Sequence, residues 1–312
     1  MKKLILFLLS STILLGLNVP NKLKQGKPGK YTLKFKDSVF AYARSGVEGM
    51  YYIPRRKSKA KPSKLPNLIV FYHGNTRNKR AYRKIPRLML REASKKGFHI
   101  LSVQNWWSLS KGYVQAAEES RIATNAMLSA IKKYKVFNEK MVITTGFSAG
   151  GLTALLVCLN SLDSSKDPAF LAQYQKAYTS GGTELPSGKT IKQVYYEQMG
   201  GQNYIFDYAG FASFKGNYYE GYIMLTPFIA DSEKMKQHYK ALFQNKIALL
   251  LVGGRRDAKR VQKQQPQAYN FIKERMGISN AIFKKYPRER HNLSRKNWND
   301  FYKLIENLNQ TN

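Results

Sequence analysis

A serine flanked by two glycines is the first group in this sequence that could carry out nucleophilic chemistry. Ser148 lies in the segment 146–150, Gly-Phe-Ser-Ala-Gly. Glycines two residues before and two residues after a serine permit a strained strand-to-helix turn that projects the hydroxyl outward. Residues 141–145 predict a buried strand before this turn, and the Ala/Leu-rich run 152–159 predicts a buried helix after it. The pattern therefore favours a nucleophile elbow over a plain glycine-rich turn.

A serine nucleophile needs a histidine to accept its proton. The chain has four histidines, at positions 73, 99, 238 and 291. His99 stands at the start of a predicted strand, His238 stands within a predicted helix, and His73 precedes the turn expected to bind the oxyanion. His291 lies in a loop after the last predicted strand, so it is the expected base.

An acid must orient that histidine and stabilise its imidazolium form. Asp257 follows the predicted strand 247–252 by five residues, at the position where such an acid is expected. Asp231, after an aromatic-rich run, is the alternative, although it could equally cap a helix. The predicted triad therefore consists of Ser148, Asp257 and His291, in that order along the chain.

Two backbone N–H groups are needed where negative charge develops on the attacked carbonyl. The amide of Ala149, next to the nucleophile, supplies one, and the amide of Asn75 in the loop opened by His73-Gly74 is expected to supply the other. Trp106 and Trp107 follow another predicted strand and could flank a substrate at the same rim, although tryptophans there could equally serve packing.

Short β-rich runs alternate with helical patterns along the chain, which predicts an α/β fold whose mostly parallel central sheet has helices on both faces. Two early runs, 31–43 and 50–54, are predicted as edge strands. The expected inner strands are 68–72, 99–103, 141–145, 208–214, 247–252 and 281–286. The expected helices are 79–96, 114–134, 150–162, 232–243, 261–276 and 295–308. The candidate residues follow these strands, and chemistry in open α/β sheets lies at the carboxyl ends of strands.

Two segments stand apart from this alternation. Residues 1–19 carry two lysines and then a short apolar run, which predicts a signal peptide or, if it is not cleaved, a membrane anchor. Residues 20–312 suit a single domain. Residues 163–204 are much longer than an ordinary connection and predict an inserted cap, with a surface elaboration as the alternative. The lone Cys158 cannot form an internal disulfide, which for an exported protein favours the bacterial envelope.

The chain is strongly basic, with 53 Lys and Arg against 19 Asp and Glu and a net charge of +34. Such a surface attracts polyanions. No recognition helix, zinc motif or stacking-strand motif supports nucleic-acid binding, and no ligand spacing supports a metal site. Arg255 and Arg288 stand close to the predicted acid and base in sequence, so they are expected at the substrate rim. Arginine forms forked hydrogen bonds with carboxylate and sulfate, which predicts an anionic substrate, with general surface basicity as the alternative.

The order serine, acid, histidine resembles the α/β-hydrolase superfamily from about residue 31 to the C-terminus. Four segments, HGN at 73–75, GFSAGG at 146–151, GGRRD at 253–257 and RHN at 290–292, look most like exported esterases of the polyhydroxybutyrate-depolymerase and feruloyl-esterase type. Members often carry cysteine and glutamine in the oxyanion loop and glycine before the histidine. This chain has Asn75, Thr76, Arg77 and Arg290 there.

The expected function is that of a secreted or periplasmic serine hydrolase that cleaves carboxylic esters through an acyl-enzyme and needs no cofactor. The substrate would be an ester, on a polyester or an anionic polysaccharide in the polymeric case. A membrane would be a partner only if residues 1–19 stay attached. A serine peptidase of the same fold and a non-catalytic polyanion-binding surface protein are the alternatives.

Overall fold

The structure is a computed structural model of the whole chain. It describes residues 17–36, 40, 43–55, 65–76, 78–105, 113–160, 206, 208–218, 237, 240–241 and 248–309. Several predictions lie outside these ranges: the insertion at 163–204, most of the signal segment 1–19 and of the helix 232–243, Trp106 and Trp107, and Asp231.

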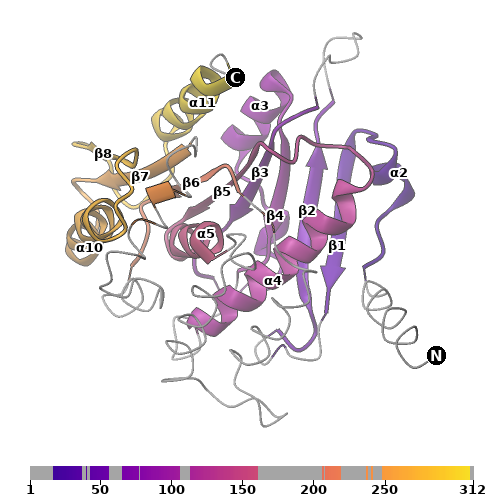
Figure 1. The fold of residues 1–312 in the computed structure, drawn as a ribbon, viewed down its shortest axis with the longest axis horizontal. Coiled ribbons are helices and arrows are strands. Elements are labelled where there is room, and N and C mark those ends of the chain that lie inside the picture. The colour runs from indigo at the N-terminus through magenta and orange to yellow at the C-terminus, as the bar shows by residue number, and fades with distance from the viewer. Residues whose placement is uncertain are drawn as a thin grey trace.

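The centre of the described fold is an eight-stranded sheet in the order β1-β2-β4-β3-β5-β6-β7-β8. In Figure 1 it extends from β1 on the right to β8 on the left. All strands from β3 to β8 run parallel, whereas β2 pairs antiparallel with both β1 and β4. The strands are β1 Gly29–Phe35, β2 Val47–Ile53, β3 Leu68–Tyr72, β4 His99–Val103, β5 Val142–Phe147, β6 Gly210–Phe214, β7 Ala248–Gly254 and β8 Ile282–Tyr286.

The predicted strands are all present in the sheet, but some of them differ from the prediction in their bounds or in whether they lie at an edge. β3 and β4 have the predicted bounds because each is a short, mostly apolar run that is fully buried. The first predicted strand, 31–43, ends early at Phe35 in β1. The second was wrongly assigned to an edge, because β2 lies between β1 and β4 and is largely buried. The true second edge is β8, which was predicted as an inner strand and is partly exposed.

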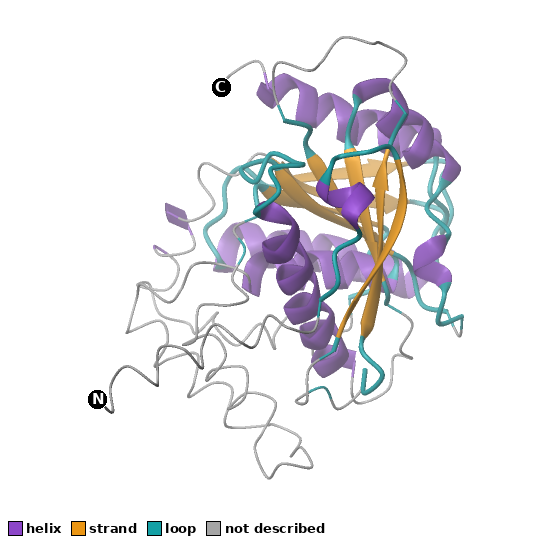
Figure 2. Ribbon diagram, turned by 90° about the vertical axis from the view of Figure 1, so that its right-hand side faces the viewer, coloured by secondary structure: helices purple, strands orange, loops and turns teal. Residues whose placement is uncertain are grey.

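Helices cover both faces of the sheet, as Figure 2 shows. One apolar core joins the sheet to α4, α5 and α10, and a second core on the other face joins it to α3 and α11. The described helices are α2 Asn21–Lys24, α3 Arg87–Lys96, α4 Tyr113–Lys132, α5 Ala149–Asn160, α10 Lys259–Asn270 and α11 Arg295–Asn309. None of these is both long enough and apolar enough to cross a membrane.

Two predicted helices are interrupted. The predicted helix 79–96 is instead a short 3₁₀ turn, Ala81–Arg83, followed by α3. Pro86 has no N–H to donate to a preceding helical turn, so α3 begins directly after it. The predicted helix 261–276 is α10 followed by a π-helical segment, Phe271–Arg275.

Trp298 fixes the helix that follows the last strand. Its side chain is fully buried and packs on Phe214 of β6, with ring centroids 4.7 Å apart, and on Phe71 of β3, at 6.3 Å. Burial of an aromatic ring of this size stabilises a fold by about 2–3 kcal/mol. The loop that carries His291 is therefore held between a paired strand, β8, and a helix packed firmly on the sheet.

Candidate active site

Ser148 occupies a sharp turn between β5 and α5. Its φ angle is +56°, in a region that non-glycine residues rarely adopt, and its N–H donates to the carbonyl of Phe214 at 3.0 Å. A Cβ atom on Gly146 would lie 1.9 Å from the carbonyl oxygen of Gly150, and one on Gly150 would lie 2.1 Å from that of Tyr72. Both glycines are therefore required by close backbone approach, which is the geometry of a nucleophile elbow.

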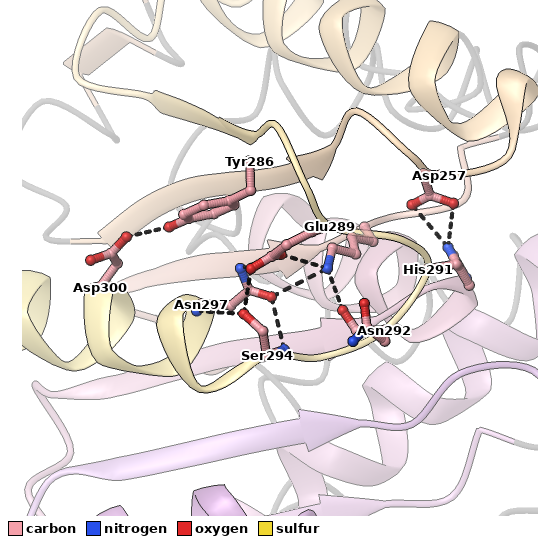
Figure 3. A network of polar contacts seen from close by, with 9 residues as sticks. Asp257, Tyr286, Glu289, His291, Asn292, Ser294, Asn297 and Asp300 are labelled. Atoms are coloured by element: carbon pink, nitrogen blue, oxygen red, sulfur yellow. Dashed lines mark hydrogen bonds and ion pairs between the residues drawn. The ribbon is translucent and has the colours of Figure 1, made fainter.

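Asp257 and His291 are brought together from two different loops (Figure 3). Nδ1 of His291 lies 2.9 Å from Oδ1 and 3.1 Å from Oδ2 of Asp257. Because a carboxylate only accepts hydrogen bonds, Nδ1 carries the proton and Nε2 is left with a lone pair. The Asp257 side chain is fully buried, and its Oδ1 also accepts from the N–H of Ala258 at 2.7 Å.

The paired imidazole lies beside the elbow. The His291 ring packs on Phe147, the residue before Ser148, with ring centroids 4.9 Å apart. The side chain of His291 is 35% exposed, so the imidazole is accessible from solvent. The predicted acid and base are thus paired beside the residue that precedes the predicted nucleophile, although no hydrogen bond joins His291 to Ser148 among the described residues. Such an arrangement can activate a hydroxyl for attack on a carbonyl.

The predicted oxyanion loop also lies against the elbow. A Cβ atom added to Gly74 would lie 3.3 Å from Cβ of Ser148, so a side chain at position 74 would crowd the nucleophile. Asn75 is exposed, and its main-chain N–H has no hydrogen-bond partner among the described residues. Ala149 is the first residue of α5, where main-chain N–H groups point out of the helix end. These two amides can approach a developing oxyanion.

His73 braces this loop and cannot act as the base. Its Nε2 accepts the N–H of Asn105 at 2.9 Å, and its Nδ1 donates to the carbonyl of Gly74 at 2.7 Å. Burial lowers the pKa of His73 and outweighs the opposing effect of the Gly74 carbonyl. Both ring nitrogens of the neutral imidazole are therefore in use, which agrees with the choice of His291.

Two residues of this brace were missed by the sequence analysis. The side-chain amide of Asn105 donates to the carbonyl of His73 at 3.0 Å, and its Oδ1 accepts from the hydroxyl of Thr153 at 3.2 Å. The signal that could have found Asn105 is its place two residues beyond β4, at the carboxyl edge of the sheet. Thr153 lies on a buried helix, where its sequence context gives no such signal.

Arg255 and Arg288, predicted for the substrate rim, are both exposed and stand on adjacent loops. The N–H of Arg255 donates to the carbonyl of Tyr286 at 2.9 Å, which joins the loop after β7 to the loop after β8. Within the described ranges, no three His, Cys, Asp or Glu side chains gather in a way that could hold a metal ion.

Comparison with known proteins gives a fold but no close relative. No protein-family model matches the chain, and no curated protein matches it. Among solved structures, it is similar to a bacterial heroin esterase, with a TM-score of 0.54 and 10% identity over 98% of this chain and 89% of that one. An arylesterase gives a TM-score of 0.51 and 10% identity over 92% and 86%. An esterase from Pyrobaculum calidifontis gives 0.50 and 11% over 97% and 90%.

At such low identity the likeness shows the fold alone. The parallel sheet, the helices on both of its faces and these structural matches together define the α/β-hydrolase fold, and this chain has that fold. The predicted α/β-hydrolase fold is thereby confirmed, whereas the insertion predicted at 163–204 lies outside the described residues and stays a prediction.

Proposed function

We propose that this protein is a serine hydrolase that cleaves carboxylic esters. The observation that carries the proposal is the pairing of the His291 imidazole with buried Asp257, beside an elbow that holds Ser148 at a positive φ angle. A surface protein that only binds polyanions has no need of a strained serine next to an acid-oriented imidazole. The solved structures of similar fold are described as esterases, which supports ester hydrolysis as the general reaction.

The proposed mechanism follows from the placement of these groups. Nε2 of His291 takes the Ser148 proton as the hydroxyl attacks the ester carbonyl, and the amides of Ala149 and Asn75 stabilise the oxyanion. The imidazolium then gives its proton to the departing alcohol, and an acyl-enzyme remains on Ser148. Water then attacks the acyl group while His291 takes a proton from it, and that proton is returned to the oxygen of Ser148 as the acid is released. Asp257 stays ionised throughout and holds the imidazole in the tautomer that leaves Nε2 free.

A fluorophosphonate probe tests the proposal directly, because it phosphonylates only a serine that a neighbouring base activates. We expect stoichiometric labelling of the folded protein, at Ser148 by peptide mass spectrometry. Heat-unfolded protein and Ser148→Ala are the controls and should remain unlabelled. If the folded protein does not react, the serine is not activated, and the alternative of a binding protein that has kept the fold would be favoured.

The substrate class is a narrower part of the proposal. Arg255 and Arg288 are exposed on two adjacent loops that lead to Asp257 and His291, which supports a position for both cations at the substrate rim. An ester on an anionic polymer would gain forked hydrogen bonds and electrostatic attraction there. The resemblance to depolymerase-type exported esterases agrees with a polymeric substrate outside the cytoplasm, and both remain predictions.

Salt should separate an anionic substrate from a neutral one. Activity on an anionic ester is expected to fall steeply as ionic strength rises past about 0.15 M, where screening acts within roughly 8 Å, while a neutral ester of similar size is unaffected. Arg255→Gln with Arg288→Gln should erase this difference. Lys27→Gln with Arg55→Gln removes the same charge from exposed positions near the opposite edge of the sheet and should preserve it. Equal salt dependence for both esters would show that the arginines do not select the substrate.

A further inference from the structure

A lysine is completely buried beside the proposed active site, and the catalytic scheme does not use it. Lys215 follows β6 directly, with a φ angle of +51° and a side chain that is 0% exposed. Its Nζ donates to Oε2 of Glu289 at 2.7 Å, to the carbonyl of Asn292, and to Oδ1 of Asn297 at 3.4 Å. The ammonium group therefore has an acceptor for each of its three protons.

The carboxylate partner is equally well satisfied. Glu289 accepts from the hydroxyl of Ser294 and, at 2.9 Å, from the side-chain amide of Asn297. Burial by itself raises the pKa of Glu289, but the hydrogen bonds from Lys215, Ser294 and Asn297 outweigh it, and the pKa lies below its usual range. Glu289 is thus ionised at neutral pH, and the two residues form a true ion pair.

The partners of Lys215 lie on both sides of the proposed base. Glu289 is two residues before His291, Asn292 is the residue after it, and Asn297 is in the first turn of α11. One buried cation therefore holds the entry to the His291 loop, its exit and the helix that follows. Among the described residues, the imidazole makes its polar contacts with Asp257 and none with the ion pair, so an effect of the pair on catalysis would pass through the path of the loop.

The same cation also stands where the three proposed catalytic loops meet. The residue before Lys215 is Phe214, whose carbonyl accepts the N–H of Ser148. The N–H of Lys215 donates to Val252 of β7 at 2.6 Å, on the strand that leads to Asp257. The carbonyl of Glu289 accepts the N–H of Arg256 at 3.0 Å, which links the acid loop to the base loop.

We infer that Lys215 and Glu289 are positioning residues for His291, which fix the loop on both sides of the imidazole so that Nε2 is directed at Ser148. The inference rests on the proposed function. A purely stabilising role explains the pair poorly, because removing two charges from water costs several kcal/mol per ion and apolar residues of similar size often stabilise a fold as well or better. What apolar residues cannot supply is three directed hydrogen bonds that join both sides of one loop to the helix after it.

The test compares variants that separate positioning from stability. Lys215→Met leaves the largely buried Glu289 carboxylate without its cation and is expected to lower both the melting temperature and kcat. Lys215→Met with Glu289→Leu replaces the pair by apolar side chains, and it should recover the melting temperature but not kcat. Ser294→Ala removes one hydrogen bond to Glu289 and keeps both charges, so it is the mildest variant. Lys132→Met breaks the exposed Lys132–Glu139 ion pair, of length 2.6 Å, and is the control.

For the double variant we expect kcat on a simple ester to fall by about 10- to 100-fold, since a displacement of about 1 Å at a reacting group costs up to that much, with KM within about twofold. Ser294→Ala should lose less, and Lys132→Met nothing. The ¹H NMR signal of the Nδ1 proton of His291, which is hydrogen-bonded to Asp257, should be sharp in the natural protein. In the double variant it should be broadened or lost.

Recovery of kcat together with the melting temperature in the double variant, or an unchanged Nδ1 resonance, would overturn the inference. A double variant that recovers the melting temperature but not kcat, and whose Nδ1 proton signal is broadened, would support the inference. The resonance does not depend on turnover. If the natural protein hydrolyses no ester, the proposed function fails, while the resonance still decides whether the ion pair positions His291.

Discussion

Replacement of Ser148 by alanine should abolish ester hydrolysis, with kcat lower by about 10⁶-fold and the fold unchanged. The reason is that no other group at the elbow can form the acyl-enzyme, while the loss of one half-buried hydroxyl costs little stability. Steady-state assays on a short nitrophenyl ester, together with thermal unfolding, would measure both effects. His291→Ala should cause a loss of similar size, because without this base no group accepts the Ser148 proton as the hydroxyl attacks.

The double variant Ser148→Ala with His291→Ala should be no less active than either single variant, because the members of a triad act as a unit. Ser279→Ala, at an exposed turn before β8, is the matched control and should keep full activity. Turnover by Ser148→Ala at more than a small fraction of the natural rate would mean that hydrolysis proceeds without an acyl-enzyme on this serine.

Asp257→Asn should lower kcat by about 10⁴-fold without unfolding the protein. The natural carboxylate accepts the proton of Nδ1, whereas a side-chain amide can turn its NH₂ group toward that nitrogen and stabilise the opposite tautomer. That tautomer carries its proton on Nε2 and cannot accept one from Ser148. Measurements of kcat and of the melting temperature on the same sample would separate this effect from instability.

Two other aspartates serve as comparisons for this change. Asp300 accepts a hydrogen bond from the hydroxyl of Tyr286, away from the imidazole, and Asp300→Asn should leave kcat nearly unchanged. Asp231, the alternative acid, lies outside the described residues. If Asp231→Asn abolished activity and Asp257→Asn were nearly neutral, the acid would be Asp231 and the geometry around His291 would need another explanation.

The parts of the fold that the sequence predicted well are those where a single local pattern decides the outcome. β3 and β4 are short, fully buried runs in which β-branched, leucine and aromatic residues predominate. The elbow was predictable from its own five-residue pattern, although the contact that requires Gly150 is made with Tyr72 of β3. The positions of Asp257 and His291 were predictable for a different reason: each follows a parallel strand, and the carboxyl ends of such strands share one edge.

The parts that could not be predicted depend on partners distant in sequence. β2 contains a glutamate and a glycine, and only its pairing with both β1 and β4 makes it an inner strand. Lys215 gave no signal, because lysine is almost never fully buried and its acceptors are more than 70 residues away. Asn105 and Thr153 are similar cases. Asn105 acquires its role only because the carbonyl of His73 lies beside it, and Thr153 acquires its role only because it contacts Asn105.

The order of the strands along the chain also determines when the proposed catalytic residues come together as the protein folds. The elbow is built from β3, β5 and α5, all of which precede β6, β7 and β8 in the chain. The base stands on the last loop, which is held only after β8 has paired with β7 and α11 has docked. A partly folded chain in which only the elbow has formed would thus hold Ser148 without its base. In the proposed mechanism, the serine gains that base only when the C-terminal part of the fold is complete.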